Sequence, residues 1–261
     1  MDEFNFDVIL PHIRGGEHMK IIRTKNYDEM SKKAADIVLK KIKTSSFLSL
    51  GLATGSTPLG LYKHLIQDYL KSYTSYEYVT TFNLDEYVGL KSHHPDSYHS
   101  FMKKHLFHHL DIPTDQTHIP DGTAEDLSLE CKQYEKLIQD AGGIDLQILG
   151  IGTNGHIGFN EPDTSFHSST HVVSLTDSTR RDNARFFKQP EEVPTHAITV
   201  GLHTIFKSKE ILLLVSGKNK ASILKQLVEG NPNEALPASI LKKHPNVTII
   251  ADEDALSLLQ P

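Results

Sequence analysis

The chain has 261 residues, 38% of them hydrophobic, which is enough to bury the core of one large α/β domain. Its formal net charge of −6 argues against a nucleic-acid-binding or membrane-surface protein. Cys131 is the only cysteine, which excludes a disulfide framework and a cysteine-rich metal site. No apolar run is long enough to span a bilayer, and the acidic start lacks the features of a signal peptide, so we expect a cytoplasmic protein.

The first eighteen residues show no clear periodicity, and Met19 resembles a natural start that leads directly into a strand. We expect residues 1–18 to be an N-terminal extension, either a tag or a misread start. Residues 19–261 are expected to form a single domain, because no linker rich in Pro, Gly or Ser interrupts them.

Short apolar runs alternate with helical patterns along this domain. Helical periodicity follows Pro58, covers Leu127 to Ile138, and stops there at Gly142 and Gly143. Runs that are typical of strands follow Met19 and cover residues 47–52, 79–84, 144–151, 172–175, 197–201, 211–216 and 247–251. This alternation predicts an α/β fold: a doubly wound, mostly parallel sheet with helices on both faces, Rossmann-like.

Polar clusters follow four of these strands, at residues 53–58, 85–87, 152–156 and 217–220. Ligands of open parallel sheets bind outside the carboxyl ends of the strands. We therefore expect the four loops to form one site that combines hydroxyl, carboxylate, imidazole and ammonium groups.

The most informative loop lies in residues 148–162, I-L-G-I-G-T-N-G-H-I-G-F-N-E-P. Its glycines allow a ligand to approach the backbone closely. His156 can give and take a proton near neutral pH, and Asn154 and Glu161 flank it with groups able to fix its tautomer. The alternative is a tight turn with a surface histidine.

A second loop predicts an anion site, because small hydroxyl residues precede a helix whose first N–H groups lack partners. The loop is neither a Walker A motif nor a dinucleotide fingerprint, and the alternative is a plain capped turn. Its residues are Thr54, Gly55, Ser56 and Thr57.

Two cationic side chains could serve the same anion. Lys220 follows a glycine and could supply a point charge, and Arg185 could supply a bidentate clamp. The alternative for Arg185 is a solvated helix face, because nothing in the pattern distinguishes it from Arg180 and Arg181.

Asp85 and Glu86 form an acid pair at a strand end, where burial beside a second acid would raise a carboxyl pKa toward the range of a general base. A turn-forming acid pair is the alternative. His105 and His109 are spaced as metal ligands on a helix, but no Glu completes the H-E-x-x-H motif, so we expect no metal site.

Several of these segments together resemble the glucosamine-6-phosphate deaminase family. They are L-A-T-G-S-T-P-L-G, F-N-L-D-E-Y-V-G-L, H-P-D-S-Y-H-S-F-M, G-T-N-G-H-I-G-F-N-E-P, the stretch from Thr176 to Phe187, and G-K-N-K-A. The similarity runs in order from about residue 19 to residue 256. The related 6-phosphogluconolactonases share the fold, but their histidine leads into a small-residue run ending in Leu-Phe-Pro.

The resemblance implies conversion of glucosamine 6-phosphate to fructose 6-phosphate and ammonia, without a metal or organic cofactor. Asp85 matches the base that moves a proton from C2 to C1, and His156 matches the group that opens the sugar ring. Asn154 and Glu161 match the orienting partners of His156. The residues that match the phosphate cradle are Thr54, Gly55, Ser56, Thr57, Arg185 and Lys220.

This resemblance also implies a role in amino-sugar catabolism, with a small sugar phosphate as the partner. The net charge argues against nucleic acid and membrane as partners, and the sequence leaves open whether the chain is a monomer or a homo-oligomer. Many members carry Asp at the position of Asn154, and we expect this difference to affect the pH dependence of the activity. Regulated members are hexamers activated by N-acetylglucosamine 6-phosphate. His171 and Val173 occupy positions where those members carry cationic side chains, and the sequence ends at Pro261 without their longer C-terminal segment.

Two alternatives stay open at this point. One is a 6-phosphogluconolactonase of the same fold. The other is a non-catalytic sugar-phosphate sensor, which would not need Asp85, His156 and Glu161 together and would normally carry a DNA-binding module.

Overall fold

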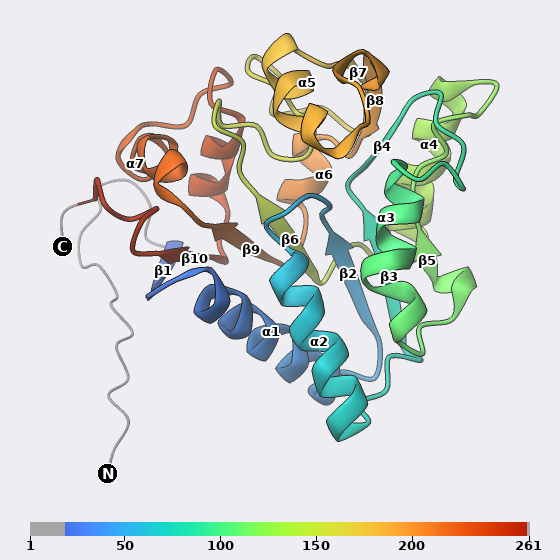
Figure 1. Ribbon diagram of the computed structural model, residues 1–261, viewed down its shortest axis with the longest axis horizontal. Helices are drawn as coiled ribbons and strands as arrows, with labels where there is room; N and C mark the ends of the chain where they lie inside the picture. Colours follow the sequence, from blue (N-terminus) through green and yellow to red (C-terminus); the bar gives the residue numbers. More distant parts are fainter. Residues whose placement is uncertain (1–18, 260–261) are drawn as a thin grey trace.

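The computed structural model describes residues 19–259, so the predicted extension, residues 1–18, lies outside the described part of the chain. A seven-stranded sheet with the order β1-β10-β9-β6-β2-β3-β5 forms its centre, and every neighbouring pair is parallel (Figure 1). The strands are β1 (Met19–Thr24), β2 (Leu48–Leu52), β3 (Val79–Asn83), β5 (Thr117–His118), β6 (Leu146–Gly150), β9 (Glu210–Val215) and β10 (Val247–Asp252).

Helices cover both faces of this sheet. One face packs against α1 (Tyr27–Thr44), α2 (Leu59–Ser72) and α3 (Tyr98–His105). The other packs against α4 (Leu127–Asp140), α6 (Leu202–Phe206) and α7 (Ala221–Glu229). In β9, Leu212 and Leu214 belong to the first core and Leu213 and Val215 to the second, so successive side chains face opposite layers. The predicted doubly wound, mostly parallel fold is confirmed.

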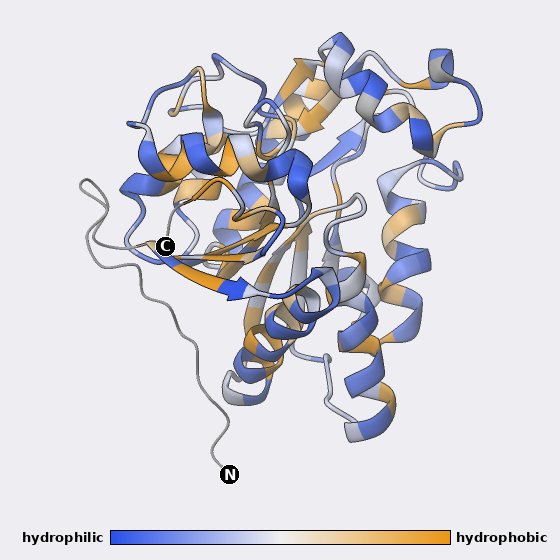
Figure 2. Ribbon diagram, turned by 60° about the vertical axis from the view of Figure 1, so that its left-hand side comes forward, coloured by the Kyte–Doolittle hydropathy of each residue, from blue (hydrophilic) through white to orange (hydrophobic). Residues whose placement is uncertain are grey.

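The central strands β2, β6, β9 and β10 are mostly apolar, whereas the helices are apolar only on the faces turned toward the sheet. Figure 2 shows this as orange strands between helices that are blue on their outer sides. In α1 the buried side chains include Met30, Ala34 and Val38, at the spacing that places residues on one helix face. The apolar periodicity read from the sequence therefore reflects burial in the two cores.

A second, three-stranded sheet with the order β4-β8-β7 lies beside the first and is antiparallel. It consists of β4 (Asp85–Tyr87), β7 (His171–Ser174) and β8 (His196–Thr199). The strands predicted at residues 172–175 and 197–201 are present as β7 and β8, but they pair in this antiparallel sheet and not in the parallel one. Exposure alternates along β7, as in a strand covered on one face, whereas a central parallel strand is buried on both.

Several element boundaries differ slightly from the prediction. The helix predicted after Pro58 is α2, which has Pro58 as its N-cap. The predicted helix around Arg185 is α5 (Asp177–Asn183) followed by the 3₁₀ helix η3 (Ala184–Phe186). The other 3₁₀ helices are η1 (Phe107–His109), η2 (Thr114–Gln116), η4 (Pro190–Glu192), η5 (Lys218–Lys220) and η6 (Pro237–Lys243). No helix within residues 19–259 is long and apolar enough to cross a membrane.

Candidate active site

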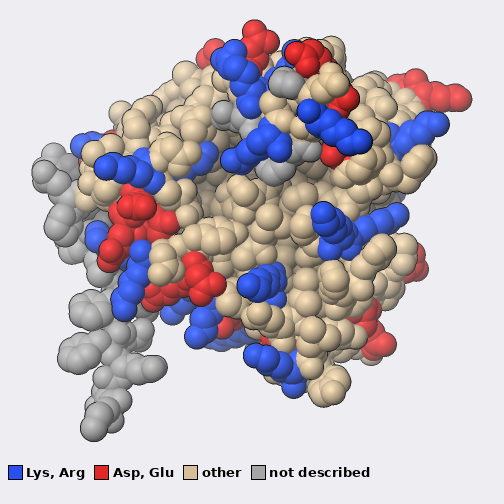
Figure 3. All heavy atoms as spheres, in the orientation of Figure 1, with Lys and Arg blue, Asp and Glu red and all other residues tan. Residues whose placement is uncertain are grey.

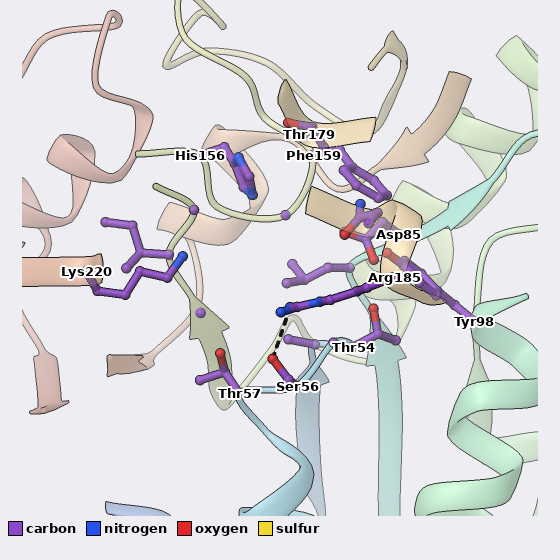
Figure 4. Close-up of a pocket in the computed structure, with 18 residues that line it drawn as sticks. Thr54, Ser56, Thr57, Asp85, Tyr98, His156, Phe159, Thr179, Arg185 and Lys220 are labelled. Atoms are coloured by element: carbon purple, nitrogen blue, oxygen red, sulfur yellow. Dashed lines mark hydrogen bonds between the residues drawn. The ribbon is translucent and has the colours of Figure 1, made fainter. Parts of the chain in front are cut away.

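A cavity of about 160 Å³ lies at the carboxyl ends of the parallel strands, where four predicted loops come together (Figure 4). Thr54, Gly55, Ser56 and Thr57 follow β2 and line one end of it. The other predicted residues that line the cavity are Asp85, His156, Arg185 and Lys220. Asn154 and Glu161 are not among the lining residues, and they lie behind His156.

His156 is held by Asn154 through two hydrogen bonds. The Asn154 Oδ1 atom accepts from the His156 backbone N–H at 3.2 Å and lies 2.7 Å from His156 Nδ1. Since the Asn154 Nδ2 atom donates to Glu161 Oε2 at 2.8 Å, the amide oxygen must face the imidazole. The neutral imidazole therefore carries its hydrogen on Nδ1, and Nε2 is the basic nitrogen.

The ring of His156 lies directly over Gly152. A Cβ atom at Gly152 would approach the ring atoms of His156 to between 2.2 and 2.5 Å. No other residue type fits there while the imidazole keeps this position. Gly152, a glycine expected to allow close approach of a ligand, thus accommodates the His156 side chain itself.

Glu161 is buried and anchors Asn154 to α5. Its Oε1 atom accepts hydrogen bonds from the hydroxyls of Thr176, at 3.2 Å, and Thr179, while its Oε2 atom accepts from Asn154. The Glu161 Oε2 atom is 3.9 Å from His156 Nδ1, so Glu161 orients the imidazole mainly through Asn154. Three donors to one carboxylate fix a chain of contacts from α5 to the imidazole.

Asp85 begins β4 and is only 6% exposed. Burial, and secondarily the charge of Glu86, raises the pKa of Asp85 to about 8. The expectation of a buried acid pair with a raised carboxyl pKa is confirmed for Asp85. A carboxyl group of this kind on a cavity wall can exchange protons near neutral pH.

Glu86 points the other way and has a structural role. Its Oε1 atom accepts hydrogen bonds from the backbone N–H groups of Tyr87, at 2.8 Å, and Tyr98, at 3.0 Å. Its Oε2 atom accepts from the His99 backbone N–H at 3.0 Å and lies 2.9 Å from His99 Nδ1. Glu86 thus binds the first turn of α3, where a negative charge is favourable, and fixes the position of its neighbour Asp85.

Basic side chains reach the end of the cavity formed by residues 54–57. Figure 4 shows Lys220 extending into the cavity from one side and Arg185 from the other. The Arg185 Nη2 atom donates to Ser56 Oγ at 3.3 Å. On the face shown in Figure 3, several Lys and Arg side chains border the area below α5. Hydroxyls, loop N–H groups and two cations at one end of a cavity form a binding site for an anion.

Asp252, at the end of β10, holds the loop that carries Lys220. It accepts hydrogen bonds from the Ser216 hydroxyl and from the Gly217 backbone N–H, at 3.0 and 3.1 Å, and it is only 4% exposed. It also accepts from the Ala255 N–H at 2.8 Å. Asp252 was not predicted, since it lies more than thirty residues from Lys220 in the sequence and only the pairing of β10 with β9 brings them together.

Aromatic side chains that were not predicted as site residues form the wall near Asp85. Tyr98 and Phe159 both line the cavity and stack with ring centroids 6.0 Å apart. Tyr87 packs on Tyr98 at 4.8 Å, and the two hydroxyls are 3.3 Å apart. Tyr98 and Phe159 could have been found, because both belong to the segments that carry the family resemblance. Thr179, also a lining residue, lies in the stretch from Thr176 to Phe187.

The histidines considered as metal ligands have other contacts. The His105 ring packs on Phe101 with centroids 4.6 Å apart, and His109 Nε2 lies 2.9 Å from the Lys104 carbonyl oxygen. Within residues 19–259, no group of three or more His, Cys, Asp or Glu side chains is placed to hold a metal ion.

Comparison with known proteins identifies similar sequences. A family model described as glucosamine-6-phosphate isomerases/6-phosphogluconolactonase matches residues 24–250. The glucosamine-6-phosphate deaminase of Halalkalibacterium halodurans is 58% identical over 238 residues, which cover 91% of this chain and 97% of the relative. The deaminase of Thermoanaerobacter pseudethanolicus is 58% identical over 241 residues, which cover 92% and 95% of the two chains.

The chain is also similar to solved structures of deaminases and lactonases. A monomeric glucosamine-6-phosphate deaminase matches with a TM-score of 0.91 and 49% identity, over 92% of this chain and 100% of the other. A 6-phosphogluconolactonase from Trypanosoma cruzi matches with a TM-score of 0.77 and 22% identity, over 96% and 100% of the two chains. At that identity the second likeness concerns the fold alone.

Proposed function

Because this chain belongs to the family of glucosamine-6-phosphate isomerases and 6-phosphogluconolactonases, we propose that its cavity converts glucosamine 6-phosphate and water to fructose 6-phosphate and ammonia. One observation carries the proposal: the buried Asp85, with its pKa near 8, shares a cavity with His156 and with a cationic end that fits a phosphate. Each feature corresponds to one requirement of this reaction. Asp85 can take a proton from carbon, His156 can relay a proton between two oxygens, and the cationic end can hold the phosphate.

The anion end binds the phosphate and orients the sugar. Arg185 clamps the phosphate oxygens, Lys220 supplies a point charge, and the hydroxyls of Ser56 and Thr57 complete the cradle. Binding energy from this remote group places C1 and C2 against the catalytic side chains, which lowers the entropic part of the barrier.

His156 opens the sugar ring. Its Nε2 atom takes the proton from the O1 hydroxyl and returns it to the ring oxygen O5, so that the C1–O5 bond breaks and an aldehyde forms at C1. The Asn154 oxygen, held in place by Glu161, accepts the Nδ1 hydrogen and stabilises the imidazolium while it carries the extra proton.

Asp85 moves a proton from C2 to C1. The carboxylate takes the C2 proton while the ammonium group on C2 passes one of its protons to O1, which gives an enolamine. Asp85 then delivers its proton to C1, which leaves a protonated imine at C2. Water adds to this imine and ammonia leaves, so that a ketone remains. An ammonium group on C2 of the incoming substrate favours the ionised form of the neighbouring carboxyl, which offsets part of the cost of its burial.

The alternative within this fold is hydrolysis of 6-phosphogluconolactone. That reaction needs one base to activate a water molecule, and it gives no role to a second, buried carboxyl such as Asp85 on the same wall. The high identity to proteins named as deaminases also favours the amino sugar. A non-catalytic sensor would require neither Asp85 nor the His156–Asn154–Glu161 chain.

One set of assays distinguishes the deaminase, the lactonase and the sensor. We expect ammonia release from glucosamine 6-phosphate and no appreciable hydrolysis of 6-phosphogluconolactone. The opposite result would establish the lactonase, and calorimetric binding of sugar phosphate without turnover of either compound would establish the sensor.

We also propose that the enzyme is a cytoplasmic monomer. The likeness to a monomeric deaminase at 49% identity supports the monomer, and a single, buried Cys131 suits a reducing compartment. Sedimentation equilibrium at assay concentrations tests the oligomeric state, and a hexamer would refute it.

A further inference from the structure

The loop of residues 54–57 is tied to a side chain from a different helix. Tyr27 is the first residue of α1, and its hydroxyl donates a hydrogen bond to the Ser56 carbonyl oxygen at 2.9 Å. The same hydroxyl accepts a hydrogen bond from the Gly60 N–H, in the first turn of α2, at 2.8 Å. One oxygen atom therefore links the loop to the helix that follows it.

This contact replaces a missing cap on α2. The N-cap of α2 is Pro58, which has no side-chain hydrogen bond to the helix. One of the N–H groups left unpaired at the start of every helix is instead bound by the Tyr27 hydroxyl. The Gly60 N–H is therefore occupied by the protein itself and is not a donor to a ligand.

The hydrogen bond to Ser56 also sets the orientation of a peptide group. Ser56 and Thr57 lie between the catalytic cavity and an outer groove that Tyr27 and Lys63 line. The Ser56 carbonyl points to Tyr27, on the groove side. In a planar trans peptide the N–H of the next residue points in the opposite direction. The Thr57 N–H is thereby directed to the cavity side, where the anion end lies.

Close packing of α1 on α2 brings Tyr27 within reach. A Cβ atom at Gly60 would lie 2.2 Å from Ser31 Oγ and 3.1 Å from Tyr27 Cε1, so only glycine permits this approach. Ser31 is fully buried at this contact, and its hydroxyl has no hydrogen-bond partner among the described residues. Ser31 supports the packing of the helices, whereas Tyr27 also makes polar contacts with the loop and with α2.

We propose that Tyr27 is a positioning residue for the phosphate cradle, whose hydroxyl holds the peptide between Ser56 and Thr57 in the orientation that presents the Thr57 N–H to the substrate phosphate. The inference deepens the proposed function and depends on it for the identity of the anion. Tyr27 lines the outer groove and not the cavity that Asp85 and His156 line, so we expect its effect to be confined to binding of the phosphate group.

The test is Tyr27→Phe, which removes one oxygen atom and keeps the ring that packs on Gly60. We expect the KM for glucosamine 6-phosphate to rise roughly 3- to 10-fold, the loss expected for about one net hydrogen bond, with kcat within about twofold of the native value. The dissociation constant of fructose 6-phosphate, measured by calorimetry, should rise by a similar factor. The kcat/KM for unphosphorylated glucosamine should stay unchanged, because that substrate does not use the cradle.

Ser31→Ala is the matched control, since it removes a hydroxyl from the same helix contact and leaves the loop untouched. It should change none of these constants. Equal losses for glucosamine and its 6-phosphate, or no change with either, would overturn the inference. If the native protein releases no ammonia, the proposed function fails, and calorimetric titration of both variants with inorganic phosphate still decides the role of Tyr27. A native protein that binds neither phosphate nor fructose 6-phosphate would overturn the inference as well.

Discussion

At the scale of single residues, the burial of Asp85 favours its proposed function but lowers the stability of the fold. Its carboxyl group is buried beside Glu86, and the raised pKa means that ionisation in the folded protein is costly. We expect Asp85→Asn to bind fructose 6-phosphate normally and to lose about 10²- to 10⁴-fold in turnover, because the amide keeps the shape and removes the base. Single-turnover rates with calorimetric binding measure both. Deamination near the native rate would show that Asp85 is not the base.

The same carboxyl predicts a pH dependence of stability. An unfolded Asp ionises near pH 4, whereas folded Asp85 ionises near pH 8. Between these values the folded state holds a proton that the unfolded state has lost, so the free energy of unfolding falls as the pH rises through this window. Asp85→Asn should therefore unfold at a higher temperature than the native protein at pH 8, with the difference shrinking toward pH 5. Thermal unfolding at both pH values measures it, and a difference that does not vary with pH would contradict the assignment.

Asn154 allows a test of the proton relay. In Asn154→Asp, a carboxylate replaces the oxygen that lies 2.7 Å from His156 Nδ1, and a negative charge favours the protonated imidazole. If the neutral imidazole is required, the acidic limb of the kcat/KM profile should move to higher pH while activity is retained. The new carboxylate also meets Glu161, where the amide now donates at 2.8 Å, so we expect lower stability at alkaline pH. A profile that stays in place would show that the imidazole does not sense residue 154.

At the scale of elements, helices and strands that depend on a local pattern could be predicted from the sequence. The arrangement of strands that depends on packing between distant segments could not. The apolar runs of β9 and β10 and the periodicity of α4 lie in contiguous stretches of sequence. Their predicted positions were correct within a few residues. The separate sheet of β4, β7 and β8 was missed, because short strands of this composition can pair either in the parallel sheet or with one another.

The candidate site followed the same division. Asp85, His156 and the loop of residues 54–57 could be predicted, because each follows a strand of the parallel sheet and all such loops meet at one edge. Tyr27 and Asp252 act on this site through hydrogen bonds to backbone groups far away in the sequence. A tyrosine at a helix start and an aspartate at a strand end carry no sequence signal for such contacts, which exist only after the elements have packed.

The 3₁₀ helix η5 offers a controlled test of the anion end, since it carries two lysines. Lys220 lines the cavity, whereas Lys218 is exposed and does not line it. We expect Lys220→Ala to raise the KM for glucosamine 6-phosphate by about 10-fold or more, the effect of losing one charged hydrogen bond, with a smaller change in kcat. Lys218→Ala should match the native protein. Similar effects of both substitutions would point to long-range attraction and not to a specific contact.

At the scale of the whole molecule, the family resemblance places the effector-binding cations of regulated members in the segment that follows Glu161 and Pro162. The segment of residues 163–173 contains no Lys or Arg. His171 Nδ1 lies 2.8 Å from the Ser169 carbonyl oxygen, which engages the imidazole within its own segment. Val173 packs against the cluster of Tyr87, Phe159, Leu175 and Ala197 and is turned toward the protein interior. Neither side chain can replace a pair of permanent charges on an effector phosphate.

We therefore expect hyperbolic kinetics and no activation by N-acetylglucosamine 6-phosphate. Activation requires a second site whose affinity for the effector differs between two states of the protein, and the described residues of this segment supply no cations for such a site. The monomer proposed above would also provide no subunit interface through which the states of several active sites could be coupled. Initial rates over a wide range of glucosamine 6-phosphate, with and without the effector, measure the Hill coefficient and the half-saturating concentration. Sigmoidal curves that the effector makes hyperbolic would refute the expectation, whereas purely competitive inhibition by the effector would place it in the catalytic cavity, where its phosphate fits the same cradle.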